Sequence, residues 1–144
     1  MTNLYERGME YFSVHDYESA ENCFLDALRD GCNKEVCLFN YSVSVFYRTT
    51  YQMKGTGIIG GMSRRGDLVI AQKSLREAYD INPANVESIR YLALCSYTLG
   101  KLIGSGNGYT VDFYKYEDML RDLDFHMYKE LADDIEVIDS QFKK

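Results

Sequence analysis

Residues 3–31 read NLYERGMEYFSVHDYESAENCFLDALRDG, and the spacing of small and large side chains in this stretch sets the fold. Apolar residues recur at helical intervals on both sides of Asp16, which predicts two helices. Asn3 and Asp16 stand where polar side chains cap helix starts, and Gly31 is suited to the left-handed conformation that ends many helices. Because the turn between the two helices is very short, we expect an antiparallel hairpin.

Small residues mark the predicted contact between these helices. Gly8 and Ala20 have little or no side chain to hold the two backbones apart, while Tyr11 and Phe24 fill the space beside the contact. Ala27 leaves room for the helix that follows. The stretch is therefore predicted to be the first unit of a stack of helices.

The same pattern resembles the tetratricopeptide repeat, a helical hairpin of about 34 residues. Residues 1–34 are similar to one such repeat, with Leu4 where Trp is usual and Cys32 where Pro is usual. The resemblance implies a single all-α domain over 1–144, in which antiparallel helix hairpins stack as a short, degenerate array. It also implies that the first helix of each unit lines a concave surface.

A second unit is expected over 35–84, with an insert at 50–66 between its two helices. Its front half alternates from Tyr41 to Tyr47 in a way that also suits a strand, but a lone strand would have no partner for its backbone, so helix is preferred. Asp67 is the expected cap of its second helix.

A partial third unit is expected over 85–111, with a helix from Asn85 that ends at Gly100 and is followed by a glycine-rich loop. Its partner helix is missing from the usual place. Spacings of three and four residues in the acidic tail over 112–144 predict an amphipathic C-terminal helix, or two.

The resemblance places a set of mostly aromatic and apolar residues on the concave surface, where an apolar helix or extended peptide would fit. The second possibility is that the C-terminal helix fills the same groove. The expected groove residues are Tyr5, Met9, Phe12, Phe39, Val43, Phe46, Tyr47, Arg90, Leu94 and Tyr97. The function we expect is therefore a non-catalytic adaptor or small chaperone, with a protein or peptide partner and a possible homodimer.

Charge suggests an alternative function. The net charge is −6, and the tail from Asp112 onward has ten acidic and five basic residues. Such a tail could imitate a nucleic-acid backbone, so the alternative is an acidic inhibitor that blocks a nucleic-acid-handling protein. We do not expect nucleic acid itself to be a partner, because the chain is acidic and would be repelled by the phosphate backbone.

Other classes receive less support from the sequence. Residues 55–60 match the G-x-G-x-x-G pattern of dinucleotide sites, but the expected context of a buried strand before it and a helix after it is lacking. Neither histidine belongs to a nucleophile motif, and the four cysteines form no Cys-x-x-Cys pair, so we expect no enzyme activity, cofactor or metal site. Without a leader or a long apolar run, we expect no membrane partner and a cytoplasmic chain with reduced thiols.

Overall fold

A computed structural model describes residues 3–53, 64–104 and 108–142. Within these ranges the chain forms seven helices and no strand, and consecutive helices pack as hairpins, so the expected all-α class is confirmed. The helices are α1 (Leu4–Ser13), α2 (Tyr17–Arg29), α3 (Lys34–Met53), α5 (Arg65–Ile81), α6 (Val86–Ile103), α7 (Gly108–Leu123) and α8 (Phe125–Gln141). This architecture is compatible with a helical repeat.

The first hairpin forms as the sequence predicts. The side chains of Asn3 and Asp16 accept hydrogen bonds from the backbone N–H groups of Glu6 and Ser19 and so cap α1 and α2. Gly31 follows α2 with a φ of 89°. Ala20 and Phe24 are fully buried between the helices.

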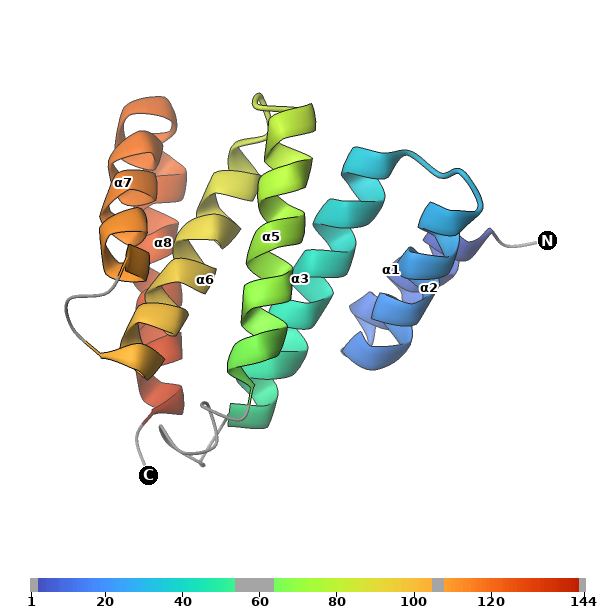
Figure 1. Cartoon of the computed structure of the whole chain (residues 1–144), viewed down its shortest axis with the longest axis horizontal. Helices are drawn as coiled ribbons and strands as arrows, with labels where there is room; N and C mark the ends of the chain where they lie inside the picture. Colours follow the sequence, from blue (N-terminus) through green and yellow to red (C-terminus); the bar gives the residue numbers. More distant parts are fainter. Residues whose placement is uncertain (1–2, 54–63, 105–107, 143–144) are drawn as a thin grey trace.

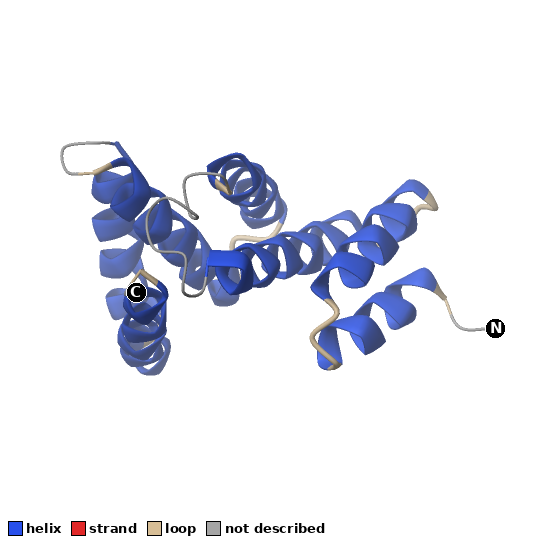
Figure 2. Cartoon of the chain, turned by 90° about the horizontal axis from the view of Figure 1, so that it is seen from below, coloured by secondary structure: helices blue, strands red, loops and turns tan. Residues whose placement is uncertain are grey.

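The hairpins stand side by side in chain order, from α1 and α2 at one end of the molecule to α7 and α8 at the other (Figure 1). Figure 2 shows that α1, beside the N label, and α8, beside the C label, lie on the same side of the molecule. Helix α6 is the most deeply packed, with twelve buried residues in 18. The main core lies between α3, α5, α6 and the last two helices.

The strand alternative for Tyr41 to Tyr47 is wrong, because this stretch is the middle of the long helix α3. The expected cap at Asp67 is also wrong. Helix α5 begins at Arg65, so Asp67 lies inside its first turn, where its carboxylate pairs with Arg48 of α3.

Two expectations for the third unit are corrected as well. Helix α6 continues through Gly100 to Ile103, because burial of Leu99 and Leu102 outweighs the helix propensity that a glycine loses, about 1 kcal/mol. The missing partner helix exists: α7 packs along α6 as the second helix of a third hairpin.

The tail over 112–144 contributes to two helices rather than one. Helix α7 already begins at Gly108, and Asp124 separates it from α8 by capping the N–H of Met127. The buried stripe of α7 consists of Phe113, Tyr116 and Leu120, which face the core.

Candidate functional site

The predicted groove residues of the first unit do not lie together. The ring of Tyr5 lies 5.9 Å from that of Phe24, and Tyr5 lines a separate hollow near Asn3 and Cys32. Phe12 instead points toward the second unit, with its ring 5.3 Å from Tyr17 and 5.9 Å from Tyr47. Met9, one turn before Phe12 on the same helix, is 39% exposed.

In the second unit the predicted groove residues differ in how far they are accessible. Val43 and Phe46 are buried in the core, whereas Phe39 and Tyr47 are half-buried. Tyr47 is the link to the third unit, because its hydroxyl lies 2.9 Å from the hydroxyl of Tyr91 in a hydrogen bond. The aromatic rings of α1, α2, α3 and α6 thus form one continuous cluster.

The third-unit residues Arg90, Leu94 and Tyr97 face α8 of the same chain. The Arg90 Nε donates to Asp134 Oδ2 at 2.7 Å. The Tyr97 hydroxyl donates to Asp139 Oδ1 at 2.6 Å. Helix α8 also packs against α3 and α7, so it covers this part of the predicted groove.

Electrostatics strengthen the contact between α6 and α8. Lys101 donates from Nζ to Asp139 Oδ1 at 2.6 Å, and this hydrogen bond raises the pKa of the lysine. Burial lowers the pKa of Arg90, but its hydrogen bond to Asp134 and that carboxylate's charge outweigh burial and raise it. Burial and the bond to Asp139 raise the pKa of Tyr97. At neutral pH both basic groups are therefore charged and the phenol is protonated.

An opening remains beside the C-terminal half of α8. Its volume is about 370 Å³, and it lies between α2, α3, α6 and α8. The lining residues are Tyr17, Phe46, Tyr47, Thr50, Leu94, Asp134, Val137, Ile138 and Gln141. Gln141 Oε1 is buried and has no hydrogen-bond partner among the described residues. Three of the ten predicted groove residues, Phe46, Tyr47 and Leu94, meet at this opening.

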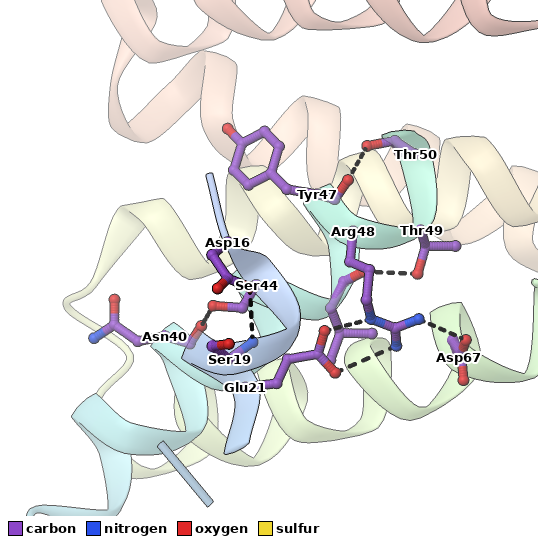
Figure 3. A network of polar contacts seen from close by, with 11 residues as sticks. Asp16, Ser19, Glu21, Asn40, Ser44, Tyr47, Arg48, Thr49, Thr50 and Asp67 are labelled. Carbon is purple, nitrogen blue, oxygen red and sulfur yellow. Dashed lines mark hydrogen bonds and ion pairs between the residues drawn. The ribbon is translucent and has the colours of Figure 1, made fainter. Parts of the chain in front are cut away.

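A second polar cluster, which sequence reasoning missed, joins three helices (Figure 3). Arg48 of α3 donates from Nε and Nη2 to the carboxylate of Glu21 on α2, and from Nη1 to Asp67 of α5 at 3.4 Å. Glu21 is only 9% exposed. The available signal was the presence of Arg48 in a segment that is otherwise apolar or neutral. This cluster ties α2, α3 and α5 together.

The dinucleotide pattern at 55–60 lies outside the described residues. The segment before it is helix α3 rather than a strand. Over the described parts of the chain, no three His, Cys, Asp or Glu side chains gather as a metal site, and no helix is long and apolar enough to span a membrane.

Comparisons with known proteins add no relative: no family model matches the chain, and neither a curated protein nor a solved structure matches it.

Proposed function

We propose that the chain is a tetratricopeptide-like scaffold without catalytic activity, which binds an apolar helix or extended segment of a partner protein. The binding site is the opening between α2, α3, α6 and α8, extended along α1 by Phe12 and Met9. The observation that carries this proposal is the volume of about 370 Å³, with Tyr17, Phe46 and Tyr47 among its lining residues. Preformed apolar openings with a few polar groups are typical binding sites.

The polar groups around the opening support a peptide ligand. Gln141 Oε1 is a buried acceptor with no bond in the described structure, so it is available to a backbone N–H of a bound segment.

Met9 offers an exposed, flexible side chain on α1 next to Phe12. Methionine and aromatic side chains bury large areas and adapt to different partners.

The acidic-inhibitor alternative has less support. Asp134 and Asp139, two of the acids on α8, are bonded to Arg90 and to Tyr97 and Lys101 within the chain. Their charges are therefore partly neutralised. The exposed acids Asp118 and Asp122 on α7 and Asp133 and Glu136 on α8 remain, which is a smaller set than the ten acids of the tail.

The proposal is tested by selecting binders from a displayed library of random 16-residue peptides. Selected peptides are expected to bind Met9→Glu at least about tenfold more weakly than the wild type, because a carboxylate at the α1 edge would have to be desolvated. Ile70→Glu is the matched control, since Ile70 is 49% exposed on α5 and belongs to none of the groove positions. Failure to select any peptide, or equal loss in both variants, would contradict the proposal.

A further inference from the structure

The opening between α2, α3, α6 and α8 has a distinct charge. Among its described lining residues there is no lysine or arginine, and the charged side chain is the carboxylate of Asp134. Gln141 Oε1 is buried there and has no hydrogen-bond partner among the described residues. The negative charge and the unpaired polar atom that a ligand meets in this opening are therefore both hydrogen-bond acceptors.

Asp134 shares its cationic partner with two other carboxylates. Arg90 Nε donates to Asp134 Oδ2 at 2.7 Å, while Arg90 Nη1 lies 3.4 Å from Glu87 Oε1 and 3.7 Å from Glu130 Oε2. One positive charge thus faces three negative charges, which leaves an excess of two negative charges. Because a carboxylate accepts hydrogen bonds at both oxygens, Asp134 retains the capacity for a second cationic donor.

Helix α8 extends this negative charge along the edge of the opening. Its residues, Phe125–Gln141, include one lysine and five acids, of which Asp133 and Glu136 are exposed. Opposite charge on a partner accelerates the encounter and discriminates against partners of like charge. The surface beside the opening therefore favours a basic segment over an acidic one.

Aromatic rings supply much of the remaining lining. The ring of Tyr47 lies 5.5 Å from that of Tyr17 and 5.4 Å from that of Phe46. Aromatic rings attract cations, most strongly where water is excluded. A wholly apolar side chain in the opening would instead cover Asp134, whose side chain is 27% exposed, and would remove its remaining water without compensation.

From these observations we propose that the opening takes a lysine or arginine side chain of the partner segment, which pairs with Asp134. Its methylene groups pack against the rings of Tyr17, Phe46 and Tyr47, as the long stems of basic side chains do on apolar surfaces. The inference rests on the proposed function and names the residue type that enters the site. Helix α8 stays in place as one wall of that site.

The rest of the segment engages other groups. Asp134 and Gln141 are seven residues apart on α8, about 10 Å along the helix, so one basic side chain does not satisfy both. Gln141 Oε1 remains the acceptor for a backbone N–H of the segment. The apolar residues of the segment cover Met9 and Phe12 on α1, a helix that contributes no described residue to the lining of the opening.

The probe for this proposal is a mixture of three displayed libraries of 16-residue peptides, with Lys, Met or Glu fixed at one central position. The other positions are random but exclude Lys and Arg. Selection on the full chain should enrich the Lys library over the other two. Selected peptides are then remade with Met at the fixed position, which keeps the length of the side chain but removes its charge. The Met peptides should bind at least about tenfold more weakly, and this difference should shrink as salt screens the charges.

The substitution Asp134→Asn tests which carboxylate is responsible. Lys peptides should lose most of their advantage over their Met counterparts on this variant, since the pair is removed from both sides of the comparison. Glu130→Gln is the matched control, because it removes another carboxylate partner of Arg90 that is not among the described lining residues. The advantage of Lys should be nearly unchanged there.

Circular dichroism verifies that both variants keep their helical content. Should Asp134→Asn fail to fold, the carboxyl ¹³C resonance of Asp134 in the isotope-labelled wild type decides. Lys peptides should shift this resonance more than their Met counterparts do.

Enrichment of the Met or Glu library would overturn the inference, as would an equal advantage of Lys on the wild type and on Asp134→Asn. Peptides from the Met library that depend on Met9 would in that case still support the proposed function. If none of the three libraries yields a binder, the proposed function fails and the inference fails with it.

Discussion

Gly8 is the residue at which the first hairpin is most sensitive to change. A Cβ atom built on Gly8 would lie 2.6 Å from Phe24 Cε1 and 2.9 Å from Phe24 Cδ1, and Phe24 is fully buried. The ring cannot withdraw without disturbing the packing between α1 and α2. The spacing of small residues predicts a close contact at Gly8, and in the structure the group that Gly8 approaches is the ring of Phe24.

We predict that Gly8→Ala destabilises the protein by about 1–2 kcal/mol. Overpacking a core costs about 1–3 kcal/mol, and the better helix propensity of alanine returns up to about 1 kcal/mol. Gly66→Ala in the first turn of α5 is the control, because a Cβ atom at Gly66 would meet nothing within 4 Å and the stability should be unchanged or slightly raised. Urea unfolding measures the stability of both variants and of the wild type. If Gly8→Ala were as stable as the wild type, the prediction would be contradicted.

At the scale of elements, the Arg48 cluster holds α2, α3 and α5 together. Burial raises the pKa of Glu21, because the loss of hydration outweighs the hydrogen bonds and positive charge of Arg48. One guanidinium is shared between the carboxylates of Glu21 and Asp67, which leaves negative charge in excess. The folded protein consequently takes up a proton at Glu21 at a higher pH than the unfolded chain does.

This raised pKa predicts a pH dependence that Glu21→Gln removes. The contribution of the group to stability is complete below the unfolded pKa of about 4.5 and is lost as pH rises through the folded value. The wild type should therefore gain stability relative to Glu21→Gln as pH falls from about 7 toward 4. Urea midpoints of the two proteins over this range provide the measurement; a constant difference, or one of opposite sign, would contradict it.

At the scale of the whole molecule, packing is uneven along the stack. Helix α6 contacts α5, α7 and α8 and has twelve buried residues, whereas α1 has only Gly8 buried and its main neighbour is α2. In stacked helical units, each unit is stabilised chiefly by its neighbours. A terminal helix with one neighbour is therefore the least stable part.

We predict that native-state hydrogen exchange is slowest for amides of α6 and fastest, among the helices, for those of α1. Opening free energies should range from near zero for the first helix to the global unfolding value for α6. The substitution Phe24→Leu should further weaken protection in α1 and leave α6 largely unchanged. Equal protection of α1 and α6 would show that the stack unfolds as one unit.

Particular residues explain how far this structure could be predicted from the sequence. Asn3, Asp16 and Gly31 act locally, so the bounds of α1 and α2 followed from their positions. Gly100 wrongly predicted the end of a helix, because the low helix propensity of glycine is a local property. The position of Gly100 inside α6 depends instead on neighbours that are distant in the sequence. Tyr5 was placed in the groove by analogy of position, yet its ring turns toward Phe24.

Short-range signals in the sequence were enough to establish an all-α chain of hairpins, because helix caps, small-residue contacts and apolar periodicity act between near neighbours. The completion of the third hairpin by α7, and the place of α8 on Arg90, Leu94 and Tyr97, became known only from the assembled helices. An aromatic or basic residue on a helix face has the same spacing whether it faces solvent, a partner or a helix of its own chain. Its neighbour is set by long-range packing and charge pairing, which no local pattern encodes.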